Sequence, residues 1–249
     1  MSSLTSLTLY DCNLQGEFPP NIFLLPRIQS IDLSYNPKLI GFLPKFQSRS
    51  SLKELRLPNT NFSGELPGSI SNLKSLNYLD LFYTKIFDEF PSSINNLKFL
   101  NYLDLSSSNF SRTIPPSIGN LSQLTHLSLS YNNFHGQLPS ILGNLKSLNH
   151  LDLDSSNISG AIPPSIGNLS QLTYLSLSDN NFHDQLPFTL GNLKSLNYLN
   201  LDSSNFPRAI PPSIGNLSQL TYLSLSYNNF HGPASIYGGK TCKTHFFET

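Results

Sequence analysis

Aliphatic residues recur along this chain at a constant interval of 24 residues. The first position of each interval is always leucine or isoleucine: Leu4, Ile28, Leu52, Leu76, Leu100, Leu124, Leu148, Leu172, Leu196 and Leu220. A second aliphatic residue follows three positions later, and a leucine two positions after that. Such a short period is the signature of a solenoid, in which each repeat forms one rung. We predict ten 24-residue rungs over residues 4–232, the tenth incomplete, and a non-repeat tail at 233–249.

Each rung combines a strand-like segment with a turn-like segment. Between Leu124 and Ser147, apolar and polar side chains alternate around Leu127 and Leu129, which predicts a short strand. Pro139 lacks the amide N–H of a strand ladder and ends the extended pairing. The following stretch is too short for an α-helix and favours a helical or 3₁₀ turn. The pattern therefore predicts a horseshoe with parallel strands on its concave face and short turns on its convex face.

Small polar residues occupy the ninth position of nine rungs, at an inward-facing turn. We predict that they form a structural ladder that satisfies buried backbone groups, weaker than an all-asparagine ladder. Its members are Asn36, Thr60, Thr84, Ser108, Asn132, Ser156, Asn180, Ser204 and Asn228. Cys12 holds this position in the first rung and is expected to be a small core residue. Because Cys242 lies near the other end of an elongated fold, no disulfide is expected between them.

A second period points to a recent duplication of a two-rung unit. Residues 100–147 and 148–195 agree at 38 of 48 positions, and residues 196–232 continue the same unit. Nearly identical rungs leave few distinguishing side chains in this half. We therefore expect a narrow binding specificity to draw on rungs one to four.

Composition limits the kinds of partner. Only 12% of the residues are charged and the formal net charge is zero, which argues against nucleic acid or an anionic membrane as the main partner. Hydrophobic residues make up 38% of the chain, enough for a packed core. No stretch approaches the ~20 apolar residues of a membrane-spanning helix, and residues 1–20 do not resemble a signal peptide.

The variable positions beside each predicted strand define a candidate ligand-binding face. The third position carries seven successive rings: Tyr78, Tyr102, His126, His150, Tyr174, Tyr198 and Tyr222. The fifth position carries a broken acidic row that includes Asp80, Asp104 and Asp152. Tyrosine suits recognition because it combines a large rigid contact area with a polar tip. The alternative is that the rings stack on one another and only stabilise the sheet.

The chemistry-bearing residues do not form a catalytic or metal-binding pattern. His126 and His150 lie in adjacent rungs, close enough for a metal site or a pH-sensing pair, but no third ligand is evident and a solvated pair is the simpler interpretation. No nucleophile, base and orienting group recur at a usable spacing. We therefore expect no enzyme activity, no metal and no cofactor.

Six Asn-x-Ser sequons are candidate glycosylation sites if the chain is secreted. Asn120, Asn168 and Asn216 fall on the predicted convex turns, where sugars would leave the concave face free. Asn61, Asn109 and Asn157 lie near the strand edge. The alternative is turn chemistry, because Asn144 and Asn192 occupy the same turn position as the first three without a sequon.

The segment from Asn59 to Leu76 resembles the plant-specific class of leucine-rich repeats, and the fold class is identified as a leucine-rich-repeat solenoid. The rung containing Ser34 to Pro44, with one inserted residue before its glycine, resembles the plant disease-resistance receptor-like proteins of the Cf and Ve classes. That resemblance implies a secreted, glycosylated ectodomain on the extracellular face of the plasma membrane or in the apoplast. It also implies a non-catalytic role in defence or developmental signalling, a protein or peptide ligand, and a co-receptor kinase as partner.

The chain departs from that family in lacking a signal peptide, cysteine-containing caps and a membrane span. We therefore expect a fragment of an ectodomain. Two alternatives remain open at this point: a soluble inhibitor of secreted cell-wall-degrading enzymes, similar to polygalacturonase inhibitors, and a non-functional gene fragment.

Overall fold

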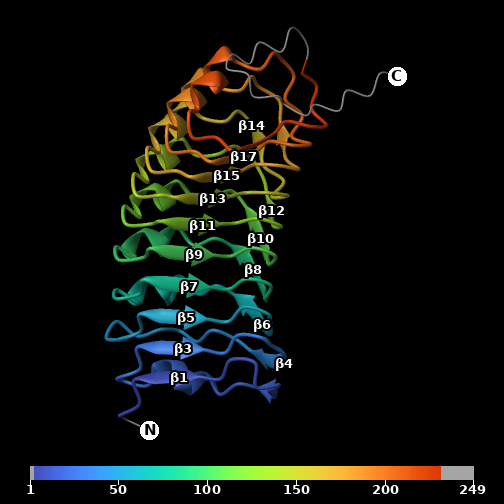
Figure 1. Ribbon diagram of the computed structural model, residues 1–249. Coiled ribbons are helices and arrows are strands. Elements are labelled where there is room, and N and C mark those ends of the chain that lie inside the picture. Colours follow the sequence, from blue (N-terminus) through green and yellow to red (C-terminus); the bar gives the residue numbers. More distant parts are fainter. Residues whose placement is uncertain (1–2, 231–249) are drawn as a thin grey trace.

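A ten-stranded parallel sheet forms one face of the molecule in the computed structural model, which describes residues 3–230 (Figure 1). Each rung contributes one three-residue strand, and successive strands pair in register, as in Tyr102 against His126. The strands are β1 (Ser6–Thr8), β3 (Ser30–Asp32), β5 (Glu54–Arg56), β7 (Tyr78–Asp80), β9 (Tyr102–Asp104), β11 (His126–Ser128), β13 (His150–Asp152), β15 (Tyr174–Ser176), β17 (Tyr198–Asn200) and β18 (Tyr222–Ser224). The strands predicted from the alternating pattern are confirmed.

The predicted convex turns are confirmed as 3₁₀ helices in eight rungs of the described chain, whereas rung two has no helix after Pro44. Each begins directly after a proline, which supplies an extended entry, and each buries one isoleucine, leucine or phenylalanine against the core. The turns are η1 (Pro20–Leu24), η2 (Gly68–Asn72), η3 (Ser92–Asn96), η4 (Pro116–Asn120), η5 (Ser140–Asn144), η6 (Pro164–Asn168), η7 (Phe188–Asn192) and η8 (Pro212–Asn216).

A second set of strands lies between the concave face and the turns, and the sequence pattern did not predict it. Six strands form one parallel sheet: β2 (Gln15–Glu17), β4 (Asn36–Gly41), β6 (Thr60–Glu65), β8 (Lys85–Glu89), β10 (Asn109–Arg112) and β12 (Asn133–Phe134). Two more, β14 (Ser159–Gly160) and β16 (Asn181–Phe182), pair separately. The residue inserted before Gly41 is absorbed by a register shift between β4 and β6.

The core runs along the solenoid between these layers. Leucine and isoleucine columns from the strands meet a phenylalanine column that includes Phe62, Phe110 and Phe134, all fully buried. The strands and turns of each rung contact their equivalents in the neighbouring rungs, so the hydrophobic stabilisation accumulates rung by rung.

The ninth-position side chains link neighbouring rungs through hydrogen bonds. Asn132 Nδ2 donates to the carbonyls of Leu105, Leu129 and Ser130, and its Oδ1 accepts the Phe110 N–H at 3.0 Å. Serine rungs make fewer bonds: Ser108 Oγ donates to the Leu81 carbonyl at 3.1 Å. In the duplicated half, asparagine and serine alternate at the ninth position. Each asparagine therefore also accepts a backbone N–H of the preceding serine rung.

The expectation for Cys12 is wrong, because this residue is exposed. Within the described residues its rung has a neighbour on one side only, so no side chain covers the thiol. Cys242, the end of the tenth rung and the tail at 233–249 lie outside the described residues. Among residues 3–230, no helix is long and apolar enough to cross a membrane.

Candidate ligand-binding face

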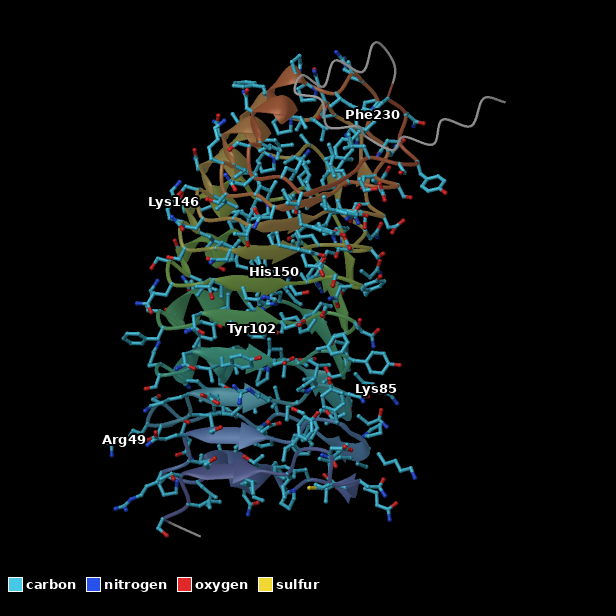
Figure 2. The ribbon with its side chains drawn as sticks, in the orientation of Figure 1. Arg49, Lys85, Tyr102, Lys146, His150 and Phe230 are labelled. Carbon is cyan, nitrogen blue, oxygen red and sulfur yellow. The ribbon has the colours of Figure 1, made fainter. Side chains whose placement is uncertain are left out.

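The seven rings at the third position form one continuous stack across the concave sheet. Neighbouring ring centroids lie 4.1–4.5 Å apart, with planes within 3–11° of parallel. Figure 2 shows Tyr102 and His150 at the centre of this face. The ring spacing is shorter than the ~4.8 Å separation of paired strands, which places these side chains on the inside of the curvature.

Stacking determines what the rings present to a ligand. Each interior ring has both faces covered by its neighbours, so only ring edges and tyrosine hydroxyls remain for contact. Burial and the nearby Asp104 raise the pKa of Tyr102 well above its ordinary value. Burial and the adjacent His150 lower the pKa of His126 to about 4. The stack is therefore an uncharged strip at neutral pH.

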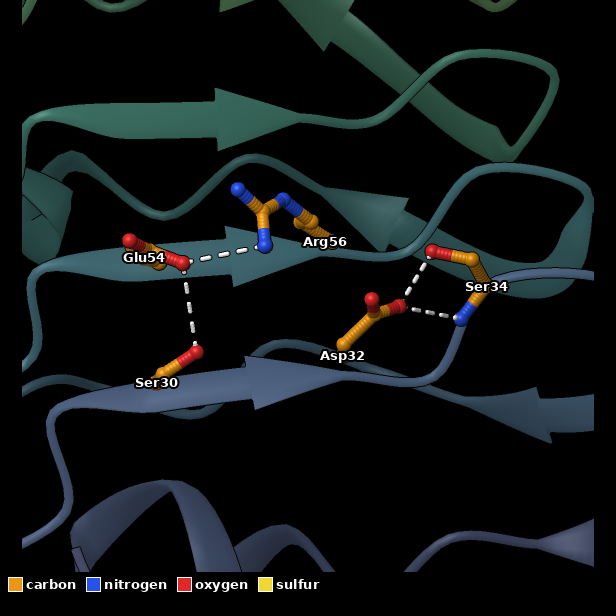
Figure 3. A network of polar contacts seen from close by, with 5 residues as sticks. All are labelled: Ser30, Asp32, Ser34, Glu54 and Arg56. Atoms are coloured by element: carbon orange, nitrogen blue, oxygen red, sulfur yellow. Dashed lines mark hydrogen bonds and ion pairs between the residues drawn. The ribbon is translucent and has the colours of Figure 1, made fainter. Parts of the chain in front are cut away.

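A guanidinium covers the first ring of the stack. Arg56 Cζ lies 4.2 Å from the centroid of the Tyr78 ring, in a cation–π arrangement. Arg56 also forms an ion pair of 3.0 Å with Glu54, which accepts a hydrogen bond from Ser30 Oγ at 3.3 Å (Figure 3). This network belongs to rungs two and three, before the aromatic column begins.

The acidic row lies beside the stack and is partly buried. Asp80 Oδ1 accepts the Phe82 N–H at 3.0 Å, and Asp104 and Asp152 accept the N–H two residues further on in the same way. Burial, with the neighbouring Asp104 as a smaller cause, raises the pKa of Asp80 to about 6. Burial also raises the pKa of Asp152 to about 6, and that of Asp104 above its ordinary value.

Two further carboxylates on this face were missed from the sequence. Asp154 and Asp202 occupy the seventh position, directly after the strands. Asp154 Oδ1 accepts hydrogen bonds from Ser176 Oγ and the Ser178 N–H, and Asp202 makes the equivalent bonds to Ser224 and Ser226. Period-two alternation places the seventh position of each rung on the same side as the third and fifth positions. Including the seventh position in the predicted concave face would therefore have identified both aspartates.

Family comparisons agree with the repeat geometry. The leucine-rich repeat region family matches residues 27–162, and the leucine rich repeat family matches residues 3–25, 171–193 and 219–238. The chain belongs to the leucine-rich-repeat family.

This leucine-rich-repeat chain is similar to several plant receptors. It is 50% identical over 52 residues to Receptor-like protein 6 of Arabidopsis thaliana, a match that covers 21% of this chain and 5% of that protein. The solved structure of the Arabidopsis receptor kinase HAESA, in complex with the peptide hormone IDA and the co-receptor SERK1, is 34% identical with a TM-score of 0.85. The plant peptide hormone receptor RGFR1 in complex with RGF2 is 30% identical with a TM-score of 0.83. Each alignment covers 92% of this chain, which spans 39% of the HAESA chain and 40% of the RGFR1 chain.

The sequons of this leucine-rich-repeat chain fall in two environments. Asn120, Asn168 and Asn216 are exposed at the ends of η4, η6 and η8, on the opposite side from the ten-stranded sheet. Asn157 is exposed too, but its Nδ2 donates to Asn133 Oδ1 at 3.0 Å. A glycan on Asn157 would replace one hydrogen of the side-chain amide that makes this bond. At Asn168, by contrast, the hydrogen bond from Lys146 Nζ goes to the backbone carbonyl and does not involve the side-chain amide.

The two histidines stack on each other and on tyrosines at either end of the pair. Over residues 3–230, no three His, Cys, Asp or Glu side chains gather in a way that could hold a metal ion.

Proposed function

We propose that this chain is a non-catalytic recognition module from the ectodomain of a plant receptor-like protein, and that it binds a peptide or protein ligand on its concave face. The observation that carries the proposal is the continuous strip of stacked rings and carboxylates from β7 to β18, which no other part of the described chain covers. Curved solenoids commonly bind partners on this side.

The solved relatives support this proposal, since HAESA was solved with the peptide hormone IDA, and RGFR1 is a peptide hormone receptor solved with RGF2. We propose residues 4–232 as the recognition unit, with 233–249 outside it. A co-receptor kinase is a further proposed partner, by analogy with SERK1 in the HAESA complex. We place the module at the extracellular face of the plasma membrane or in the apoplast, in defence or developmental signalling. Glycans on Asn120, Asn168 and Asn216 would then occupy the convex side.

Binding of the purified chain to secreted plant peptides and microbial proteins tests the proposal. Replacing Tyr102 and Tyr174 together by alanine should weaken a detected interaction at least about tenfold, because each change removes ring edge and hydroxyl contacts from the strip. Tyr83→Ala with Tyr131→Ala is the matched control, since these tyrosines are 60% and 62% exposed at the edge of the face and belong to no stack. If the Tyr102 and Tyr174 variant keeps every interaction, the concave face is not the binding surface.

The inhibitor alternative predicts a different readout. A polygalacturonase assayed with and without excess chain would lose activity if the chain were an inhibitor of cell-wall-degrading enzymes, and would keep it if the chain acts only as a receptor module.

A further inference from the structure

Charges are segregated between the two sides of this electrically neutral chain. From β7 to β18, the third, fifth and seventh positions hold five carboxylates and no lysine or arginine: Asp80, Asp104, Asp152, Asp154 and Asp202. Exposed lysines instead follow the convex turns, at Lys74, Lys98, Lys146 and Lys194. Figure 2 shows Lys146 and Lys85 at opposite edges of the molecule, away from His150. The concave face is therefore anionic as a whole.

In several rungs the fifth-position side chain supplies an acceptor oxygen to the backbone, and this role does not require a charge. In β17, Asn200 Oδ1 accepts the Asp202 N–H at 3.1 Å. This is the bond that Asp80, Asp104 and Asp152 make in their own rungs. An amide thus performs the structural role, and the negative charge of the aspartates is additional to it.

That additional charge opposes folding. Asp80 and Asp104 are direct partners in adjacent parallel strands, so two carboxylates face each other across one strand spacing. Burial and this proximity raise the pKa of Asp80. Perturbed carboxylates of this kind concentrate at functional sites, where a bound partner offsets their cost.

One residue of the chain indicates which kind of ligand group complements the aspartate row. Arg56 occupies the fifth position between Asp32 and Asp80, in register with both. Its guanidinium lies over the end ring of the stack, that of Tyr78. This cation favours the ionised form of Asp80, whereas the carboxylates beyond it have no internal counterpart at the same positions.

Two pairs of these carboxylates share the same spacing along the solenoid. Asp104 and Asp152 are two rungs apart, as are Asp154 and Asp202, which corresponds to roughly 9 Å between members of each pair. A peptide in the polyproline II conformation advances ~3.1 Å per residue with three residues per turn, so every third side chain points the same way at a spacing of ~9 Å.

We propose that the concave face from β7 to β18 binds an extended cationic peptide whose lysine or arginine side chains recur at every third residue and meet the aspartate row. This inference rests on the proposed function, because it specifies the ligand of the same face.

The test uses the full chain and an acetylated, amidated peptide of four Arg-Pro-Pro units, with affinity measured by calorimetry at pH 7 in low and moderate salt. The triple variant Asp104→Asn, Asp152→Asn and Asp154→Asn keeps every Oδ1 acceptor and should bind at least about tenfold more weakly. The matched control is Asp11→Asn, Asp88→Asn and Asp184→Asn, which makes the same change in net charge away from the row and should bind as the parent does. Raising the salt concentration should weaken binding to the parent and to the control.

Two further peptides test the charge and the spacing. A peptide of Glu-Pro-Pro units should not bind, and an isomer with its four arginines grouped at one end should bind several-fold more weakly. Equal affinity of the triple variant and the control, or equal binding of the acidic peptide, overturns the proposal, and equal affinity of the grouped isomer overturns its spacing. If a neutral or acidic ligand instead binds in a Tyr102- and Tyr174-dependent way, the recognition module stands and only its cationic specificity fails.

Discussion

Single residues on the concave face show a conflict between folding and charge. Asp80 is not part of the hydrophobic core, yet it is partly buried and lies beside Asp104. Its Oδ1 satisfies one backbone N–H, a role that Asn200 fills without charge. An acceptor oxygen is therefore sufficient for the structural role of Asp80, and its charge must be explained separately.

Replacing Asp80 by asparagine should stabilise the chain in a pH-dependent way. The pKa of Asp80 is raised from 3.8 to about 6 in the folded state, so the protonated acid is favoured by folding. That contribution is complete below pH ~4 and is lost as the pH rises through 6. Asp80→Asn should therefore match the parent near pH 4 and exceed it by about 1–3 kcal/mol at pH 7. Urea unfolding at both pH values measures this, and a constant difference at the two would contradict the assigned cause.

At the scale of the rung, two contacts determine how one repeat fits the next. The ninth-position ladder connects the turn after each strand, and asparagine does this with more bonds than serine. On the convex side, η6 and η7 approach so closely that a glycine is required between them. A Cβ on Gly167 would lie 2.3 Å from the Thr189 carbonyl oxygen.

Removing a ladder asparagine should cost more than removing a ladder serine. Asn132→Ala leaves the buried Phe110 N–H and two or more carbonyls without their partner, which should cost about 3 kcal/mol. Ser108→Ala removes a smaller set of bonds and should cost about 1 kcal/mol. Equal losses in chemical denaturation would show that the ladder does not depend on the asparagine geometry.

Replacing a glycine of a convex turn by alanine should show whether close packing between turns, and not the backbone preference of glycine, requires that residue. Gly167→Ala should destabilise by about 3 kcal/mol or more, because its Cβ meets backbone that cannot move without shifting η7. Gly68→Ala in η2 is the control, since its Cβ would meet nothing within 4 Å and should change stability little. Similar melting temperatures for the two variants would rule out the packing explanation.

At the scale of the whole molecule, the duplication makes rungs interchangeable in structure but not on the surface. The two units differ at ten positions, and three of these differences lie on the concave face: Tyr102 against His150, Ser106 against Asp154, and His126 against Tyr174. The expectation that specificity draws on rungs one to four stays a prediction. These three positions give the two duplicated units different concave surfaces, which could discriminate between ligands.

Deleting residues 148–195 should shorten the solenoid without unfolding it. The deletion joins Ser147 to Leu196, and this new junction has the same local sequence as the native junctions at either end of the deleted segment. Rung six then lies against rung nine and can make the contacts with it that rung eight makes in the full chain. One cooperative thermal transition should remain, lower by about 5–10 °C because fewer rungs stack. Deleting residues 148–183 removes one and a half rungs and should abolish cooperative unfolding, as monitored by circular dichroism. Loss of the transition in the whole-unit deletion would mean that distant rungs couple more strongly than nearest neighbours.

The repeat itself was determined by the sequence alone. A strict 24-residue period, the alternation around residues such as Leu127, and the proline before each turn are local signals, and each leads directly to a strand or a 3₁₀ turn. Register followed as well, since in-phase stacking of equal repeats leaves one solution, with Tyr78 against Tyr102 and so on along the sheet. The family resemblance has the same origin, because it is carried by these periodic positions.

Only the tertiary structure decided how side chains from different rungs share space. The second sheet forms because neighbouring rungs bring strands such as β8 and β10 within pairing distance. The exposure of Cys12, the face-to-face stacking of His126 on His150, and the raised pKa of Asp80 all depend on what lies one rung away. A single rung has no inside or outside until its neighbours stack on it, and burial and electrostatic coupling are set at that step.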